Sequence, residues 1–202
     1  MAQTVCTCGI DGVNKAHKAI SFGGVIIFPT DTVYGIACSP YEKNAIRRVY
    51  KIKGRSATKH LPVLADSYKD LENFCKFDSR HKKMAEKFWP GPITMVVKLL
   101  DKDIAKAMDL VDTIAVRVPS GECARSVLAA CGPLACTSAN ISGSPSAINY
   151  EQCSNLDADV GLDGGTVKGG IESTIIDVAR DKLHILRKGP VLEKEVYSTW
   201  ED

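Results

Sequence analysis

The sequence predicts an α/β fold in which helices flank a twisted mixed sheet. Short continuous apolar runs alternate along the chain with segments of helical periodicity. The run at residues 25–28 is apolar throughout, which is typical of a strand buried on both faces. Two late strands, 173–178 and 183–187, follow each other directly, so strands and helices intermix. With 202 residues the chain is expected to form one domain, 1–202, with its core at about 14–192.

The first two helices have clear boundary signals. Residues 13–22 predict a helix that ends at Gly23-Gly24. Ser39 is expected to cap the second helix, with Pro40 in its first turn and Glu42 completing a capping box. Gly54 is expected to end that helix and to leave Lys53 and Arg55 on a mobile exit loop.

The rest of the pattern continues the alternation of strands and helices. The Pro90-Gly91-Pro92 run is a break between a helix and a strand. The remaining expected elements are strands at 61–65, 93–99, 114–118, 134–136, 173–178 and 183–187 and helices at 66–74, 79–88 and 120–130.

Charge is balanced overall but clustered locally. The chain has 26 basic and 24 acidic side chains, so its net charge of +2 says little about partners. No carboxylate interrupts the cations between residues 43 and 60, which are Lys43, Arg47, Arg48, Lys51, Lys53, Arg55 and Lys59. Such a cluster suits phosphate or nucleic acid, and a solvated helix face is the alternative.

The eight cysteines lack the C-x-x-C spacing of zinc and redox sites, and no metal site is expected. Cys38, Cys131 and Cys136 lie in apolar runs, where cysteine acts as a small hydrophobic residue. All eight are therefore expected to be reduced thiols in a cytoplasmic protein. No apolar signal-peptide core and no apolar run of about 20 residues is seen, so membrane insertion is not expected.

Polar groups follow several expected strands. Thr30, Asp31, Thr32 and Tyr34 come directly after the strand at 25–28. An ordinary polar turn would have the same composition, so the segment alone leaves both interpretations open. Lys53-Gly54-Arg55 places a point charge and a planar guanidinium beside a glycine, which suits a phosphate group.

The segment 137–143 combines three hydroxyls with the amide of Asn140, and its backbone N–H groups could surround phosphate oxygens. Ser138 lacks the G-x-S-x-G context of a hydrolase nucleophile. Residues 169–174 and 187–190 again place hydroxyls or cations at strand ends. Because α/β proteins usually bind ligands at such ends, a pocket for an anionic ligand is predicted.

A set of motifs spread from Gly24 to Pro190 resembles the threonylcarbamoyl-AMP synthase family, whose domain is called YrdC-like. The matching motifs are Pro29-Thr30-Asp31-Thr32-Val33-Tyr34-Gly35, Lys53-x-Arg55, Trp89-Pro90-Gly91-Pro92-Ile93-Thr94, Ala115-Val116-Arg117-Val118-Pro119, Ser138-Ala139-Asn140-Ile141-Ser142-Gly143, Ser173-Thr174-Ile175-Ile176-Asp177 and Arg187-Lys188-Gly189. The resemblance implies a large basic concave cavity within the mixed sheet.

The activity that this resemblance implies is nucleotidyl transfer. L-Threonine, bicarbonate or CO2, and ATP with Mg2+ would give L-threonylcarbamoyladenylate and pyrophosphate. A downstream tRNA threonylcarbamoyl transferase would use the product to modify the adenosine next to the anticodon, and an RNA contact is a further expectation.

The resemblance also assigns roles to single residues of this chain. The expected catalytic residues are Lys53, Arg55, Ser138 and Asn140. The expected threonine-binding residues are Thr32, Arg117, Ser173 and, through its backbone, Cys136. The expected nucleotide-binding residues are Arg55, Lys59, Thr113, Ser138, Ser146 and Arg187.

The sequence departs from the family pattern in two respects. Leu64 stands where some relatives have a threonine-binding His, and the second C-terminal domain of longer relatives is not found in this sequence.

Two alternative functions stay open. A non-catalytic module for double-stranded RNA or ribosome maturation would use the basic helix, but it has little need for Thr32, Ser138, Asn140 and Ser173. The YrdC-like domain of hydrogenase-maturing carbamoyltransferases usually belongs to a much longer chain.

Overall fold

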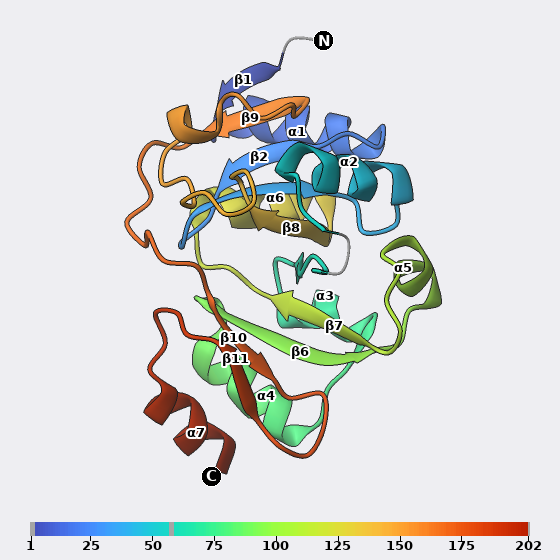
Figure 1. Cartoon of the computed structure of the whole chain (residues 1–202), viewed down its shortest axis with the longest axis vertical. Helices are drawn as coiled ribbons and strands as arrows, with labels where there is room; N and C mark the ends of the chain where they lie inside the picture. The colour runs from blue at the N-terminus through green and yellow to red at the C-terminus, as the bar shows by residue number, and fades with distance from the viewer. Residues whose placement is uncertain (1–2, 57–58, 202) are drawn as a thin grey trace.

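A computed structural model describes residues 3–56 and 59–201, and its strands form one mixed sheet (Figure 1). The strand order is β1-β9-β2-β3-β8-β4-β7-β6-β10-β11, with β5 added beside β6. Their bounds are β1 (Thr4–Thr7), β2 (Ile26–Pro29), β3 (Tyr34–Cys38), β4 (Val63–Leu64), β5 (Cys75–Lys76), β6 (Ile93–Leu99), β7 (Thr113–Arg117), β8 (Leu134–Ser138), β9 (Val160–Asp163), β10 (Thr174–Asp177) and β11 (His184–Arg187). The sheet is mixed as predicted, since β10 is parallel to β6 but antiparallel to β11.

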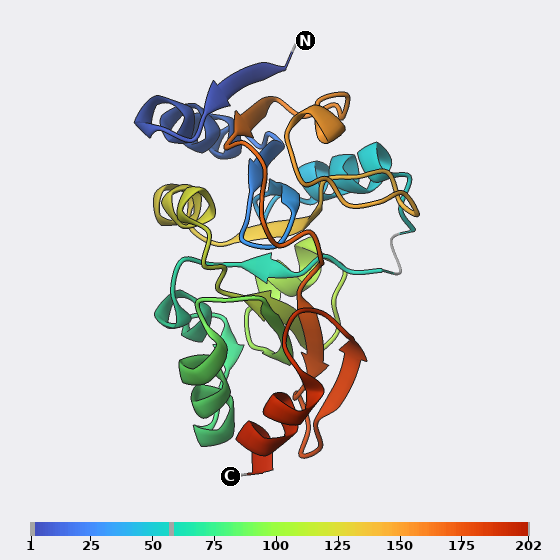
Figure 2. The same ribbon diagram turned by 90° about the vertical axis from the view of Figure 1, so that its left-hand side faces the viewer.

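Helices cover both faces of this sheet (Figure 2). Their bounds are α1 (Ile10–Ser21), α2 (Lys43–Lys53), α3 (Tyr68–Glu72), α4 (Ser79–Phe88), α5 (Lys102–Ala107), α6 (Glu122–Cys131), α7 (Glu193–Glu201) and a 3-10 turn, η1 (Glu151–Cys153). Among these helices, which belong to the described part of the chain, none has the length and apolar character that a membrane crossing requires.

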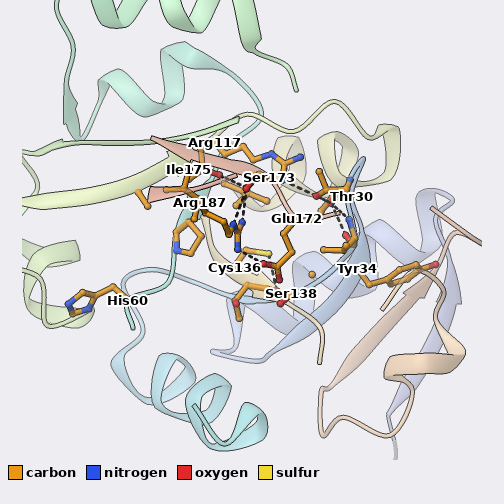
Figure 3. A pocket seen from close by; sticks show the side chains of 18 of the residues that line it. Thr30, Tyr34, His60, Arg117, Cys136, Ser138, Glu172, Ser173, Ile175 and Arg187 are labelled. Carbon is orange, nitrogen blue, oxygen red and sulfur yellow. Dashed lines mark hydrogen bonds and ion pairs between the residues drawn. The ribbon is translucent and has the colours of Figure 1, made fainter. Parts of the chain in front are cut away.

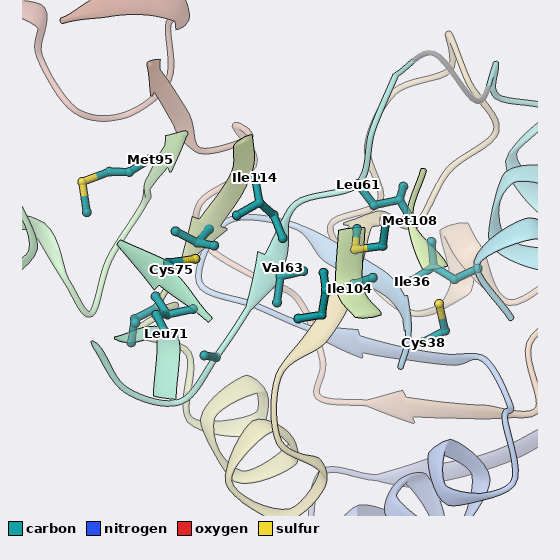
Figure 4. Close-up of a cluster of buried hydrophobic side chains, with 14 of the residues drawn as sticks. Ile36, Cys38, Leu61, Val63, Leu71, Cys75, Met95, Ile104, Met108 and Ile114 are labelled. Carbon is teal, nitrogen blue, oxygen red and sulfur yellow. The ribbon is translucent and has the colours of Figure 1, made fainter. Parts of the chain in front are cut away.

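The core has one part on each side of β2, because side chains alternate along a strand. Ile26 and Phe28 pack with α1 and α6, whereas Val25 and Ile27 pack in the larger cluster that includes α2. The larger cluster continues into the second half of the sheet, where Val63, Met95 and Ile114 are buried (Figure 4). Opposed hydrophobic layers therefore hold the strands that carry the polar groups predicted from the sequence.

Several predicted boundaries agree with the structure. The helix predicted at 79–88 is α4 and the strand predicted at 93–99 is β6. Asp78 caps α4 through the His81 N–H, and the His81 side chain accepts a hydrogen bond from the Asp78 N–H in return. Gly54 ends α2 in the left-handed conformation, with φ of 58°. These signals are local, which is why sequence pattern is sufficient to find them.

The predicted start of α2 is wrong. The helix begins at Lys43 with Glu42 at its N-cap, and no side chain caps it. Ser39 instead accepts a hydrogen bond from the Tyr41 N–H within the preceding turn. The predicted exit-loop position of Lys53 is also wrong, because Lys53 is the last residue of α2 and its side chain is buried.

Seven elements of the described chain are absent from the sequence-based prediction: β1, β3, β5, β9, α5, η1 and α7. The most consequential is β3, which forms a hairpin with β2 and pairs on its other side with β8. Strand β8 is longer than predicted and includes Thr137 and Ser138, so these residues belong to the sheet rather than to a loop. Pairing with distant strands, rather than local propensity, decides these segments.

The prediction that all cysteines are reduced is wrong for one pair. Cys8, before α1, forms a disulfide with Cys123 in the first turn of α6. Their Cα atoms lie 5.5 Å apart although 115 positions separate them along the chain. Spacing along the sequence could not show this pair, because packing of α1 against α6 brings it together. Cys38 and Cys136 are buried free thiols, as predicted.

Candidate active site

One cavity brings together side chains from the hairpin β2–β3, from β7, β8 and β11, and from the segments beside them (Figure 3). Its volume, counted with its open mouth, is about 740 Å3. Seven of the residues predicted for the site line it, namely Thr32, Arg55, Arg117, Cys136, Ser138, Ser173 and Arg187. Among the described lining residues, Arg55, Arg117 and Arg187 are basic and Glu172 is acidic. These residues, which are far apart in the sequence, converge on one cavity, and their binding roles stay predictions.

Arg117, at the end of β7, organises one wall. Its Nε donates to the Gly91 carbonyl at 2.9 Å, and Nη1 donates to Thr32 Oγ1 at 3.0 Å. Nη2 pairs with Asp31 at 2.7 Å. Burial is the largest influence on the Arg117 guanidinium and lowers its pKa, which the Asp31 carboxylate opposes. These contacts fix a buried cation and the Thr32 hydroxyl together, an arrangement that suits a small carboxylate ligand.

Ser173 joins this wall to Arg187. Ser173 Oγ lies 2.8 Å from Thr94 Oγ1, and both side chains are buried. Arg187 Nη2 donates to Ser173 Oγ at 3.1 Å, and Arg187 Nε donates to the Ser173 carbonyl at 3.0 Å. The Arg187 guanidinium is therefore oriented by the segment that precedes β10 as well as by its own strand, β11.

Lys53 lies under the segment 138–140 rather than in the cavity lining. Its ammonium group donates to the Ser138 carbonyl, to the Asn140 carbonyl at 2.7 Å and to Asn140 Oδ1 at 3.0 Å. Burial, followed by the nearby Arg55 charge, lowers the Lys53 pKa to about 8. An ammonium group has three N–H donors, so these contacts use all of them. The geometry gives Lys53 a positioning function for Ser138 and Asn140, and its predicted catalytic role stays a prediction.

Arg55 crosses from the end of α2 to the mouth of the cavity. Its Nε donates to the Lys59 carbonyl at 3.0 Å, and Nη2 donates to the His60 carbonyl at 3.3 Å. Nη1 donates to Thr137 Oγ1 at 3.3 Å. The guanidinium is partly exposed, so it can both hold the 59–60 backbone and face an anion in the cavity.

Glu172 is a cavity residue that the sequence analysis did not select. Its carboxylate accepts from Ser146 Oγ at 2.9 Å and pairs with Arg187 Nη1. The Ser138 hydroxyl hydrogen-bonds either this carboxylate or Asn140 Oδ1, since its single proton serves one acceptor at a time. Burial would raise the Glu172 pKa, but the hydrogen bond from Ser138 and the Arg187 charge outweigh it, and the pKa is lowered.

Three other predicted residues lie beside the cavity rather than in its lining. Ser146 reaches it only through Glu172. Thr113 is on the same face of β7 as Ala115 and Arg117, which do line the cavity. Lys59 is exposed and contacts Arg55 through its backbone carbonyl. Of the predicted set, Lys53 and Asn140 also contact the cavity only indirectly, through Ser138.

Thr94 and Leu64 also line the cavity. Thr94 belongs to a motif noted in the sequence, and only its contact with Ser173 shows that its hydroxyl faces the site. Leu64 does line the cavity, so an apolar side chain faces the ligand space at this position. Within residues 3–56 and 59–201, no three His, Cys, Asp or Glu side chains gather as a metal site.

Comparison with known proteins agrees with this geometry. The Sua5/YciO/YrdC family model, described as "Telomere recombination", matches residues 18–189. The chain belongs to this family. It is 33% identical over 189 residues to the threonylcarbamoyl-AMP synthase of Pyrococcus abyssi, covering 91% of this chain and 56% of the relative. It is 34% identical over 196 residues to the human threonylcarbamoyl-AMP synthase, covering 91% of this chain and 69% of the relative.

A solved structure of a family member shows the same fold. The structure of P. abyssi Sua5 complexed with L-threonine matches with a TM-score of 0.86 and 30% identity, over 98% of this chain and 60% of that chain. This agreement confirms the predicted mixed sheet flanked by helices. The chain spans little more than half of the archaeal synthase, so activity, substrates and partners are proposals for this protein.

Proposed function

We propose that this family member forms L-threonylcarbamoyladenylate and pyrophosphate from L-threonine, bicarbonate or CO2, and ATP. The observation that carries the proposal is that Arg117, Thr32 and Ser173 share one cavity with Arg55, Ser138 and Arg187. The first group suits an amino acid, and the second suits phosphate oxygens. The names of the similar proteins and the threonine complex of one of them support the same activity.

The proposed reaction requires the cavity to hold an unstable carbamate intermediate. The neutral amine of threonine attacks the carbon of CO2 and loses a proton, which gives a carbamate. A carbamate oxygen then attacks the α-phosphorus of ATP, and pyrophosphate leaves. A cavity that excludes most water would protect the carbamate from decomposition.

In this proposal Arg117 binds the threonine carboxylate through N–H groups beyond the three already used by Gly91, Thr32 and Asp31. Arg55 and Arg187 counter the negative charge that grows on the phosphoryl oxygens. Lys53 holds Ser138 and Asn140 where they orient the nucleotide. No covalent enzyme intermediate is required.

Mg2+ is proposed to enter with ATP and to neutralise polyphosphate charge. Among the described residues that line the cavity, the one carboxylate is that of Glu172, and it is paired with Arg187. The donors on this chain therefore fit a metal that arrives on the phosphates of its substrate rather than a metal held by the protein alone.

The proposed setting is tRNA modification in the cytoplasm. The adenylate would be passed to a downstream tRNA threonylcarbamoyl transferase, and direct RNA contact would use exposed cations such as Lys51 and Lys59. The comparisons do not favour the alternative of a non-catalytic RNA-binding module, because the similar proteins are named as synthases.

The deciding experiment is incubation with threonine, bicarbonate, Mg2+ and ATP, followed by mass detection of the adenylate. The product is expected with threonine and not with threonine omitted. Binding of RNA without adenylate formation would support the alternative function instead.

Arg55→Ala tests the assigned charge role. Loss of one strong electrostatic donor is expected to cost about 2–4 kcal/mol of transition-state stabilisation. The measurement is ATP–pyrophosphate exchange in the presence of threonine and bicarbonate, with Arg47→Ala as a matched control from the exposed face of α2. Near-normal exchange by the Arg55 variant would show that another group carries the charge.

A further inference from the structure

Glu172 occupies the hydrogen-bond donors that an anionic ligand would use. Its two oxygens are taken by the Ser146 hydroxyl at 2.9 Å and by Arg187 Nη1, and the Ser138 hydroxyl is within hydrogen-bonding reach of the same carboxylate. In Figure 3 the Glu172 side chain points toward Ser138 and the Arg187 guanidinium. Ser138, Ser146 and Arg187 are three of the six residues predicted to bind the nucleotide, and all three surround the carboxylate of Glu172.

This carboxylate is in a position to be replaced. The Glu172 side chain is 32% exposed and that of Arg187 is 38% exposed, so solvent and ligands reach the pair. Solvent exposure weakens an ion pair, because water screens its charges. A rotation of the Glu172 side chain into solvent would free the donors.

Two of the three donors, Arg187 and Ser138, have partners besides Glu172. Arg187 is held separately by its Nε bond to the Ser173 carbonyl and its Nη2 bond to Ser173 Oγ. Ser138 retains Asn140 Oδ1 as a partner at 2.6 Å. Glu172 is therefore not the group that orients these residues, and its contacts fit a competitor for them better than a support.

We propose that Glu172 is a specificity-determining residue: it fills the Arg187 subsite as an internal anion and yields it to polyphosphates but not to monoanions. A carboxylate, bicarbonate or chloride ion offers Arg187 no more charge than Glu172 does, and Glu172 is already tethered there. A diphosphate or triphosphate offers several charges and more oxygens, so it displaces the side chain.

Such selection has a purpose in this cavity. The proposed function, on which the inference rests, brings two monoanions, the threonine carboxylate and bicarbonate, into a space lined by Arg55, Arg117 and Arg187. Without competition at Arg187, either monoanion would bind at the place meant for phosphate. Arg117 keeps N–H groups beyond those used by Gly91, Thr32 and Asp31, so it stays open to the threonine carboxylate.

The test is calorimetric titration of inorganic pyrophosphate, without Mg2+, into the wild type and into Glu172→Gln. The variant keeps the shape of the side chain and removes its charge. It is expected to bind pyrophosphate about tenfold more tightly, because no internal anion competes for the donors. Acetate, used as a monoanion probe, should compete with pyrophosphate in the variant at concentrations that leave the wild type unaffected.

Glu195→Gln is the matched control, since it makes the same charge change on an exposed residue of α7. It should bind pyrophosphate like the wild type. Glu172→Ala is a second variant with the same expectation as Glu172→Gln, and thermal melting establishes that each is folded. If both folded Glu172 variants bind pyrophosphate equally or more weakly than the wild type, the inference is wrong.

Failure of this inference can be distinguished from failure of the proposed function. Adenylate formation by the wild type, measured in parallel, decides whether the synthase activity stands. A wild type that forms the adenylate, together with Glu172 variants that show no gain in pyrophosphate affinity, would overturn this inference alone. A wild type that binds pyrophosphate but makes no adenylate would overturn the activity.

Discussion

Lys53 shows at the scale of one residue how burial changes the use of a charge. The sequence places it in a basic cluster, which indicates a solvent-facing cation. In the structure it is 2% exposed, and its three donors hold the backbone and side chain of the segment 138–140. A buried ammonium without such partners would be strongly unfavourable, so the same contacts that satisfy Lys53 also fix Ser138 and Asn140.

Lys53 also makes a pH-dependent contribution to stability. Its folded pKa of about 8 is below the ordinary value of 10.5, so between these pH values the unfolded chain binds more protons than the folded chain. The free energy of unfolding of the wild type should therefore rise relative to Lys53→Met as pH increases through this range, by at most ~3 kcal/mol. Chemical denaturation at both ends of the range measures it.

Lys51→Met on the exposed side of the same helix is the control, and it should show no such dependence on pH. A difference between wild type and Lys53→Met that stays constant with pH would contradict the lowered pKa.

At the scale of elements, the start of α6 sets the shape of the β2–β3 turn. The Ser120 N–H donates to Asp31 Oδ1 at 3.2 Å, and Asp31 in turn pairs with Arg117. A Cβ on Gly121 would lie 2.8 Å from the Asp31 nitrogen and 3.0 Å from the Thr30 carbonyl carbon. The turn can approach α6 this closely only because position 121 has no side chain.

Gly121→Ala should therefore push the turn away from α6 and disturb Thr32. We expect a loss of about 1–3 kcal/mol in the free energy of unfolding, as for other overpacked sites, and weaker threonine binding. Denaturation and threonine titration measure the two effects. Gly9→Ala is a matched control at the N-cap of α1, where the nearest atom to a new Cβ, Thr7 Oγ1, lies 3.8 Å away. Unchanged threonine affinity in Gly121→Ala would show that the turn tolerates displacement.

The elements also show where sequence patterns stop being informative. Helix α4 and strand β6 are specified by local caps and periodicity, and both were predicted with correct bounds. Strand β3 contains Gly35 and Ala37, which have weak strand propensity. Its place depends on pairing with β2 and β8, and a Cβ on Gly35 would lie 2.7 Å from Cys136 Sγ. Such a contact is invisible until the strands are assembled.

At the scale of the whole molecule, the Cys8–Cys123 disulfide joins the N-terminal segment to α6 across 115 positions of sequence. Crosslinks over long loops restrict the unfolded chain, so Cys123→Ser should lower the free energy of unfolding by about 2–4 kcal/mol. Denaturation with and without a dithiol reductant measures this effect. Reduction should destabilise the wild type by a similar amount and leave Cys123→Ser unchanged.

Cys6→Ser is the control, because Cys6 is a free, partly exposed thiol on β1 close to the disulfide. It should keep the sensitivity of the wild type to reductant. A wild type whose unfolding does not respond to the reductant would contradict a stabilising disulfide.

The cavity contains residues that were predicted from the sequence and one, Glu172, that was not. Hydroxyls and a guanidinium at strand ends indicated Thr32, Ser138 and Arg187, whereas the family resemblance supplied Arg117. Glu172 was not selected, because a single carboxylate beside a glycine-rich segment carries no signal of its own. The single-domain organisation of residues 1–202 stays a prediction.

The sequence by itself determined the fold class, the family and most of the polar groups of the cavity, because periodicity, caps and motifs depend on residues that are close together along the chain. Only the tertiary structure decided which groups meet. It paired Glu172 with Arg187, buried Lys53 beneath Ser138, and joined Cys8 to Cys123. The physical reason is that burial and contact between distant segments, which set the charge and partners of a side chain, arise only when the sheet has assembled.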